Sequence, residues 1–293
     1  MKVAVYGQTI HESDGKYIAE LLRELERVDA KISIERDFQE QLANRGLNFT
    51  SNTFSQSDGL DAGFELFISI GGDGTMLRAV TFIGNKGIPI VGVNTGRLGF
   101  LSTFKKEDVK KLVTEFAANN FSIEERSLVE ISLDDDTSEL GDINYALNEV
   151  TVSRKDTTSM ITVETYLDEE YLTSYWADGL IVATPTGSTG YSLSCGGPVM
   201  APTAKSLVLT PIAPHNLNAR PLVISDDTEI RLKVSGREEN HLVSLDSRIA
   251  TIPNGKEIRI RKSNFTIKMV EYKSESFLKT LRNKLLWGED RRN

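Results

Sequence analysis

The stretch Leu66-Phe67-Ile68-Ser69-Ile70-Gly71-Gly72-Asp73-Gly74-Thr75 decides how the first third of the chain folds. Its apolar run predicts a buried strand, and the glycines that follow predict a tight turn into a helix that begins at about Thr75. Three glycines let a ligand approach the main chain closely, and a helix N-terminus offers free N–H groups to an anion. We interpret this stretch as a phosphate-binding turn. A purely structural strand-to-helix turn is the alternative.

Asp73 is the unusual member of this turn. A carboxylate among main-chain amides that face a phosphate is electrostatically unfavourable unless it accepts a proton or holds a metal ion. Two other phosphate loops can be excluded. A Walker A loop requires Ser or Thr after Gly-Lys, and neither Gly15-Lys16 nor Gly255-Lys256 is followed by one. A dinucleotide fingerprint requires a third glycine after Gly72 and Gly74, and Leu77 occupies that position. The turn is therefore not an ordinary site for hydride transfer.

Apolar and amphipathic segments alternate on both sides of this turn. Short apolar runs predict strands at 3–6, 32–34 and 88–93, amphipathic segments between them predict helices, and the polar segment 50–63 predicts a loop. Strands that alternate with helices are typical of a parallel sheet covered by helices. We therefore expect an α/β N-terminal domain with a Rossmann-like parallel sheet.

The pattern changes after about residue 120. Segments 130–133, 161–166 and 229–234 alternate apolar and polar residues, as half-buried antiparallel strands do. The chain is predicted to end in a helix, about 274–293, that packs back on the first domain. We therefore expect two domains: residues 1–120 joined by that helix, and an all-β, β-sandwich-like domain over residues 121–273.

The composition narrows the function classes. The chain has 293 residues and a formal net charge of −8, which argues against a protein whose main task is binding nucleic acid. Cys195 is its single cysteine, which excludes an intramolecular disulfide and a thiolate metal cluster and favours a cytoplasmic location. No stretch approaches the roughly 18 apolar residues that span a bilayer, so no membrane partner is expected.

Two further segments carry polar groups suited to a nucleotide. The run Leu180–Ala183 predicts a strand that leads into the hydroxyl- and glycine-rich loop 184–192, whose side chains and N–H groups can hydrogen-bond phosphate or ribose oxygens. A hydroxyl-rich hairpin or bulge without a ligand is the alternative. Asn148-Glu149 borders a predicted strand through Val150 and Val152, and on its own this pair is more simply a loop.

Together these segments resemble the NAD kinase family, in the same order, at comparable separations and over nearly the whole chain. Gly-Gly-Asp-Gly-Thr alone is less specific, because phosphofructokinases and diacylglycerol or sphingosine kinases carry similar loops. The hydroxyl-rich loop and the segment Pro211–His215 restrict the resemblance to the NAD kinases. The segments that carry it are Gly71-Gly72-Asp73-Gly74-Thr75, Asn148-Glu149, the run from Asp178-Gly179 to Tyr191-Ser192, and Pro211-Ile212-Ala213-Pro214-His215.

The resemblance implies a reaction and a set of residues. NAD kinases transfer the γ-phosphate of ATP, bound with Mg²⁺ or another divalent cation, to the 2′-hydroxyl of the adenosine ribose of NAD. By resemblance, Asp73 would accept the proton of that hydroxyl, and no side chain is assigned as a metal ligand. The resemblance places the substrate-binding positions at Gly72, Gly74, Thr75, Arg78, Asn148, Glu149, Asp178, Thr189, Gly190, Tyr191, Ser192, Ser194, Asp246 and Arg248.

Three positions depart from the family pattern. Gly190 stands where Ala is common in the family, a small departure that should not abolish binding. Trp176 stands where many bacterial members have Arg, and Arg248 stands where the family has Gln after the run Asp246-Ser247. Arg248 could still contact an anionic phosphate. The resemblance also implies a homo-oligomer, a dimer or a tetramer, in which Asp178 reaches the ligand of a neighbouring subunit.

Two other functions stay open at this point. A lipid kinase that acts on diacylglycerol or sphingosine could share the Gly-Gly-Asp-Gly-Thr loop, but it needs an apolar lipid-binding surface that the sequence does not show. A non-catalytic protein that senses NAD or NADP would bind without turnover. Asp73 argues against the second function, because binding alone does not require a base.

Overall fold

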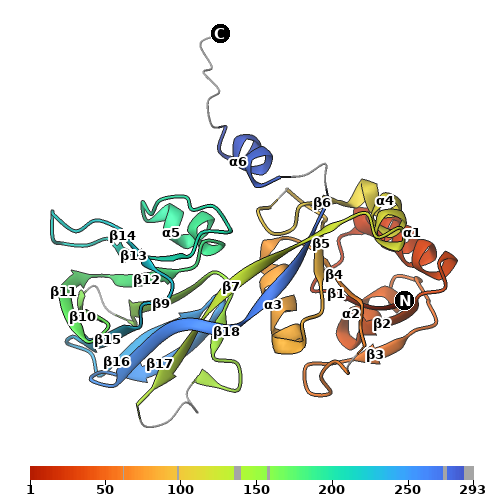
Figure 1. The fold of residues 1–293 in the computed structure, drawn as a ribbon. Coiled ribbons are helices and arrows are strands. Elements are labelled where there is room, and N and C mark those ends of the chain that lie inside the picture. Colours follow the sequence, from red (N-terminus) through yellow and green to blue (C-terminus); the bar gives the residue numbers. More distant parts are fainter. Residues whose placement is uncertain (62, 98, 135–139, 157–158, 273–275, 287–293) are drawn as a thin grey trace. The chain divides into compact units, whose positions relative to one another are not determined.

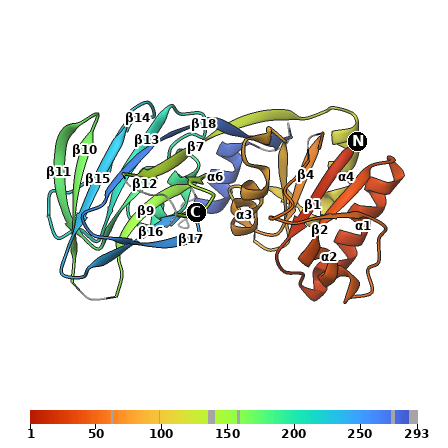
Figure 2. The ribbon, with the colours of Figure 1, turned by 90° about the horizontal axis from the view of Figure 1, so that it is seen from below.

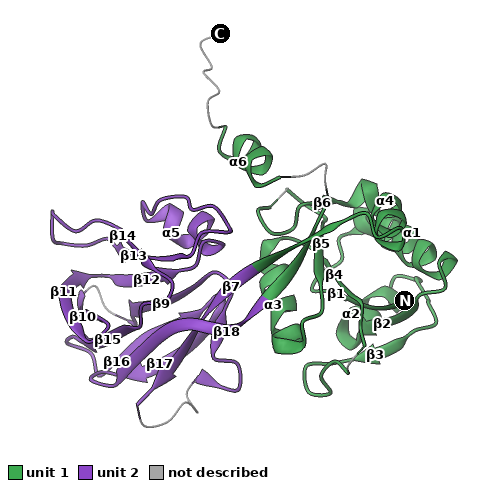
Figure 3. Ribbon diagram, in the orientation of Figure 1, with its two compact units in different colours: residues 1–125, 267–293 green, residues 126–266 purple. Residues whose placement is uncertain are grey.

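The computed structural model describes the chain except residues 62, 98, 135–139, 157–158, 273–275 and 287–293. The chain divides into two compact units, and Figure 3 shows them in different colours. Unit 1 comprises residues 1–125 and 267–293, and unit 2 comprises residues 126–266. The domain limits expected from the sequence lie a few residues from these.

Unit 1 contains a parallel sheet with helices. Its strands are β1 (Lys2–Gly7), β2 (Lys31–Glu35), β3 (Asn52–Phe54), β4 (Leu66–Ile70), β5 (Ile90–Asn94) and the short β6 (Phe104–Lys105). Its helices are α1 (Gly15–Arg27), α2 (Arg36–Ala43), α3 (Asp73–Ile83), α4 (Val109–Ala117) and α6 (Phe277–Leu285). The strands follow the order β5-β4-β1-β2-β3 with parallel pairing throughout, and β6 pairs with β5. This order confirms the predicted parallel sheet.

Helices cover both faces of this sheet (Figure 1; Figure 2). Val3 and Val5 of β1 share one hydrophobic core with the apolar sides of α1 and α4. On the opposite face, Tyr6 packs with Phe67 of β4 and with Phe82 of α3, whose ring centroid lies 4.9 Å from that of Tyr6. Burial on both faces explains why the strand β4 is a continuous apolar run rather than an alternating one.

One strand of unit 1 lies where the sequence predicted a loop. β3 falls within the polar segment 50–63 and pairs with the outer edge of β2. It has three residues, and two of them, Asn52 and Thr53, are exposed, so it leaves no apolar pattern in the sequence.

Helix α6 confirms the predicted C-terminal helix over the residues that the structure describes; residues 274, 275 and 287–293 of the predicted range lie outside them. The helix belongs to unit 1, where the ammonium of Lys284 lies 5.8 Å from the ring centroid of Phe100. Leu281 is buried, whereas Leu278 is 61% exposed. The leucines of this helix are thus only partly covered.

Unit 2 is built from two antiparallel layers. One layer is a six-stranded sheet in the order β14-β13-β12-β9-β16-β17, and the other has the order β11-β10-β15-β18 with β7 and β8 beside β18. The strands are β7 (Ser122–Leu133), β8 (Tyr145–Ala146), β9 (Glu149–Arg154), β10 (Ile161–Leu167), β11 (Glu170–Ala177), β12 (Gly179–Ala183), β13 (Ser206–Ile212), β14 (Leu222–Ser225), β15 (Ile230–Ser235), β16 (Asn240–Leu245), β17 (Arg248–Pro253) and β18 (Glu257–Glu271). The first four residues of β7 and the last five of β18 belong to unit 1.

The two layers of unit 2 enclose one hydrophobic core. Val150 and Leu180 of the six-stranded sheet pack in the same cluster as Val163 and Leu232 of the other layer. This arrangement confirms the predicted β-sandwich-like domain. Among the residues that the structure describes, no helix is long and apolar enough to cross a membrane.

The central strand β12 is buried on both faces. Leu180 faces the core between the layers, while Ile181 packs with Met200 and Val208 beneath the short helix α5 (Tyr191–Ser194) and its flanking loops. A strand covered on both sides needs no polar residues, which accounts for the unbroken apolar run from which it was predicted.

Candidate active site

The turn between β4 and α3 places Asp73 at the carboxyl edge of the parallel sheet. Gly71 has a φ of 149°, and a Cβ there would lie 2.3 Å from Thr75 Oγ1, so the turn requires glycine at this position. A Cβ at Gly72 or Gly74 would meet no described atom within 4 Å. The contact with Thr75 and the positive φ therefore explain why residue 71 is glycine. Gly72 and Gly74 instead border space that a ligand can enter. Helix α3 begins at Asp73, two residues before the predicted start.

The carboxylate of Asp73 is held by the main chain of the segment 100–102. Its Oδ2 accepts a hydrogen bond from Phe100 N at 2.8 Å, and its Oδ1 accepts from Leu101 N at 3.1 Å and from Ser102 N at 2.9 Å. A carboxylate offers about four acceptor positions, two on each oxygen. These contacts use both positions on Oδ1 and one on Oδ2. Among the described residues, no further donor occupies the second position on Oδ2.

Arg78 lies one helical turn beyond Gly74, on the exposed side of α3. Its guanidinium lies close enough to the hydroxyl of Tyr6 to affect the pKa of that group. Burial raises the pKa of Tyr6 to about 12, and the charge of Arg78 opposes that shift. Tyr6 therefore stays neutral near pH 7, with its hydroxyl near the guanidinium of Arg78.

In unit 2, Asp246 organises the segment 147–149. Asp246 and Ser247 form the two-residue turn between β16 and β17, and Asp246 has a φ of 53°. Its Oδ2 accepts from Leu147 N at 3.0 Å, and its Oδ1 accepts from Asn148 N at 2.8 Å and from Glu149 N at 3.3 Å. The carboxylate of Asp246 thus fixes the main chain that presents Asn148 and Glu149.

Three buried polar atoms gather beside this segment. Asn148 Oδ1, Glu149 Oε2 and Thr186 Oγ1 have no hydrogen-bond partner among the described residues. Buried polar groups are nearly always hydrogen-bonded, so these three atoms are free to form hydrogen bonds with a ligand. Burial raises the pKa of Glu149 to about 8, and the nearby Asp246 carboxylate adds to this shift. Burial also raises the pKa of Asp246, against the opposing effect of its three N–H partners.

The hydroxyl-rich loop after β12 folds against Asn148 and Glu149. Thr184 N donates to Asn148 O at 2.9 Å, and a Cβ at Gly187 would lie 2.1 Å from the same oxygen. A Cβ at Gly190 would lie 3.3 Å from Asn148 Nδ2 and 3.5 Å from Glu149 Oε2. The structure therefore brings Asn148, Glu149 and Gly190 together.

The other predicted residues of this loop differ in their surroundings. Ser192 is buried, and its hydroxyl shares a hydrogen bond of 2.8 Å with Thr210 Oγ1. Thr189 Oγ1 donates to Thr186 O at 3.1 Å, and Ser194 N lies 3.5 Å from Gly190 O. Tyr191 is 45% exposed. Its ring is thus accessible to a ligand, while the hydroxyl of Ser192 serves the packing of the loop.

Asp178 lies at the other end of β12 from this cluster. The register pairs Gly179 with Ser153 and Ala183 with Glu149, so about five residues, or roughly 15 Å, separate Asp178 from Glu149. Asp178 Oδ1 forms an ion pair of 2.9 Å with Arg154 Nε. Within one chain, Asp178 is therefore not part of the Asn148–Glu149 cluster.

Arg248 makes contacts within its own unit. One of its guanidinium nitrogens donates to Ile143 O at 2.7 Å, and the other donates to Tyr145 O. The side chain thus tethers the segment before β9 to the turn at Asp246. Trp176, at the other unusual position, is 47% exposed, and its ring centroid lies 4.4 Å from that of His215.

The segment 99–102 and the single residue Thr186 were not among the site residues predicted from the sequence. A local signal for the first was present: Gly96 and Gly99 follow the buried strand β5, next to β4 in the sheet, so they form a second glycine-containing turn at the same edge. Thr186 was part of the quoted hydroxyl-rich loop. Nothing in its sequence position distinguishes it from the neighbouring hydroxyls.

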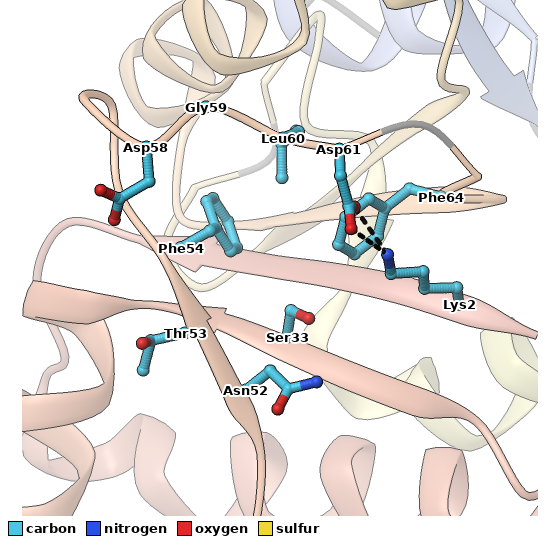
Figure 4. A pocket seen from close by; sticks show the side chains of 10 residues that line it. All are labelled: Lys2, Ser33, Asn52, Thr53, Phe54, Asp58, Gly59, Leu60, Asp61 and Phe64. Carbon is cyan, nitrogen blue, oxygen red and sulfur yellow. Dashed lines mark hydrogen bonds and ion pairs between the residues drawn. The ribbon is translucent and has the colours of Figure 1, made fainter.

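Unit 1 also has a pocket of about 560 Å³ (Figure 4). Lys2, the first residue of β1, forms an ion pair of 2.6 Å with Asp61 at its wall. Asp73 follows the carboxyl end of β4, and the two strands are parallel. The pocket therefore lies toward the amino edge of the sheet and is not part of the Asp73 site. The described residues hold no group of three His, Cys, Asp or Glu that could bind a metal ion.

Comparisons with known proteins agree with this arrangement. Family models match the chain in both halves: the ATP-NAD kinase N-terminal domain at residues 8–121 and the ATP-NAD kinase C-terminal domain at residues 147–272. The chain is 56% identical to the NAD kinase of Flavobacterium psychrophilum and 55% identical to that of Christiangramia forsetii, in each case over 294 residues that cover 100% of both chains.

Two solved structures are similar as well. Yeast NADH kinase complexed with NADH matches with a TM-score of 0.87 and 25% identity, covering 99% of this chain and 88% of the yeast chain. An NAD kinase from Archaeoglobus fulgidus in complex with ATP matches with a TM-score of 0.75 and 27% identity, covering 98% of this chain and 99% of the other. With both domains matched and curated relatives similar along its full length, the chain belongs to the NAD kinase family of enzymes.

Proposed function

We propose that this chain transfers the γ-phosphoryl group of ATP to the 2′-hydroxyl of the adenosine ribose of NAD and so forms NADP. Full-length relatives named NAD kinase, at 54–56% identity, support this reaction and do not favour a lipid kinase. The observation that carries the proposal is the orientation of Asp73. Its carboxylate lies at the start of α3, beside two glycines that border open space, with one acceptor position left on Oδ2.

In the proposed step, the ribose 2′-oxygen bonds to the γ-phosphorus while its proton passes to Asp73 Oδ2. The bond between the γ-phosphorus and the bridging oxygen breaks, and ADP leaves with that electron pair. Because the transition state is loose, most of the acceleration comes from positioning and from charge stabilisation by N–H groups in the first turn of α3. General-base assistance of this kind contributes about 10²- to 10⁴-fold.

We propose that ATP enters as its complex with Mg²⁺ or another divalent cation. The cation would help to neutralise the negative charge that develops on the phosphate oxygens of ATP. It is part of the substrate in this proposal, and no residue of the chain is assigned to it. Removing divalent cations with a chelator should abolish NADP formation, and adding Mg²⁺ in excess should restore it.

We further propose that the chain forms a homo-oligomer, a dimer or a tetramer, in which Asp178 serves the site of a neighbouring subunit. The separation of Asp178 from the Asn148–Glu149 cluster along β12 supports a role outside its own subunit. Co-expressed Asp73→Asn and Asp178→Ala chains should then regain activity that neither has alone, because mixed oligomers contain an intact site. A monomeric mass in solution would contradict this proposal.

A parallel assay tests the function against its alternatives. The purified chain is incubated with NAD, ATP and Mg²⁺, and NADP is measured with an NADP-specific dehydrogenase. Further reactions replace ATP with polyphosphate, or NAD with NADH or diacylglycerol. NADP formation supports the proposal. Phosphorylated lipid would indicate a lipid kinase, and thermal stabilisation by NAD without NADP formation would indicate a sensor.

A further inference from the structure

Gly99 makes an unusually close approach to Asp73. A Cβ at Gly99 would lie 1.7 Å from Asp73 Oδ1 and 2.4 Å from its Cγ, and the three nearest atoms all belong to this carboxylate. Gly99 is not among the glycines whose φ lies in the left-handed region, where an L side chain would be strained whatever the space. Glycine at this position is therefore explained by the carboxylate of Asp73 rather than by the conformation of the turn.

The turn that contains Gly99 has little freedom to move away from Asp73. Ser102 Oγ donates to Gly71 O at 2.9 Å, in the turn that precedes Asp73. Asn94 Nδ2, at the end of β5, donates to Ser102 O at 3.1 Å, and a Cβ at Gly92 would lie 2.7 Å from Ser102 Cα. The turn is thus anchored to β4 and β5, and a methyl group added at Gly99 would displace the side chain of Asp73.

We propose that the turn Gly99–Ser102 is a positioning device for Asp73. Its three N–H groups fix both carboxylate oxygens, and the missing side chain at Gly99 leaves room for Oδ1, so that the free acceptor position on Oδ2 has one defined direction. The inference rests on the proposed function, in which Asp73 is the base. Displacing a reacting group by about 1 Å can lower the rate about 10²-fold.

The first test compares two alanine substitutions in the segment that follows β5, at Gly99 and at Gly96. Gly99→Ala places a methyl group against the carboxylate. Gly96→Ala is the matched control, because a Cβ there would meet no described atom within 4 Å and its φ is also outside the left-handed region. We expect Gly99→Ala to lower kcat about 10²-fold or more while KM for NAD changes little, and Gly96→Ala to leave both near the wild-type values. A wild-type kcat for Gly99→Ala would overturn the proposal.

A double-mutant cycle separates positioning from a role in folding. Asp73→Ala removes the carboxylate that the new methyl group would meet. In that background, Gly99→Ala should change neither the residual kcat nor the melting temperature. If Gly99→Ala lowers the melting temperature equally with and without Asp73, the glycine serves the turn itself and the proposal is wrong.

The two claims can fail separately. If the wild-type chain forms no NADP, the proposed function fails. The melting temperatures of the four proteins in the cycle still decide whether Gly99 acts through the side chain of Asp73, because that readout does not depend on turnover.

Discussion

Replacing Glu149 by Gln should remove a pH-dependent loss of stability from unit 2. The residue is 8% exposed, and burial together with Asp246 raises its pKa from 4.5 to about 8. A carboxyl whose pKa is higher in the folded state contributes stability that is fully present below its unfolded value and is lost as the pH rises through the folded value. For Glu149 this window extends from about pH 4.5 to about pH 8. Gln cannot ionise, so the variant lacks this loss.

The magnitude follows from proton linkage. One proton held only by the folded state changes the free energy of unfolding by about 1.4 kcal/mol per pH unit. Because the buried Asp246 competes for the same proton, we expect the wild type to lose about 1 to 3 kcal/mol relative to Glu149→Gln between pH 5 and pH 7.

Urea unfolding at several pH values measures this difference. Trp176 belongs to unit 2, and Trp287 is the other tryptophan of the chain, so a Trp287→Phe background makes fluorescence report on unit 2 alone. Both proteins, with Glu149 and with Glu149→Gln, carry Trp287→Phe. The difference between their free energies of unfolding at each pH cancels the titration of all other groups. A difference between Glu149→Gln and the wild type that is constant from pH 5 to pH 8 would refute the reasoning, because it would mean that the folded state does not retain the proton.

Three further outcomes are expected. Gly190→Ala should keep NADP formation within a few-fold of wild type, because its Cβ would lie 3.3 Å from both Asn148 Nδ2 and Gly187 O, so that these neighbours need to shift by only a few tenths of an ångström; a complete loss would contradict this. Gly71→Ala should destabilise the chain by about 1 to 3 kcal/mol in urea unfolding, since its φ is 149° and its Cβ would meet Thr75 Oγ1. His241 is buried against Asn254, and burial lowers its pKa. Its contribution to stability is present above about pH 6.5 and is lost as the pH falls below it, so the wild-type melting temperature should fall there more steeply than that of His241→Gln.

Local patterns predicted the elements that are buried on one or both faces. The apolar runs of β4 and β12 and the alternating strands of unit 2 are visible in the sequence, because burial selects apolar residues with a regular spacing. β3 escaped prediction since two of its three side chains are exposed. Its position depends on the edge of β2, which is distant in sequence.

The candidate site was predictable only in part, for the same reason. The glycine-rich turn and the hydroxyl-rich loop are contiguous segments, so their composition reveals them. The contact between Asp73 and the turn at Gly99 joins residues 26 positions apart, and the contact between Asp246 and Asn148 joins residues 98 positions apart. Such contacts are set by the parallel register of the sheet and by the β16–β17 turn. Sequence composition therefore did not indicate that Asp246 organises the main chain around Glu149 or that Arg248 is held by carbonyl groups.

The turnover of Asp73→Asn tests the central claim most directly. Asn retains an oxygen that can accept from Leu101 N and Ser102 N, whereas its amide nitrogen would face Phe100 N, so the variant loses one hydrogen bond and the acceptor position for the proton. NADP formation from NAD and ATP should show a kcat lower than that of the wild type by about 10²-fold or more, with NAD still raising the melting temperature of both proteins. A variant that binds NAD and turns over at a rate near that of the wild type would contradict the assignment of Asp73 as the base.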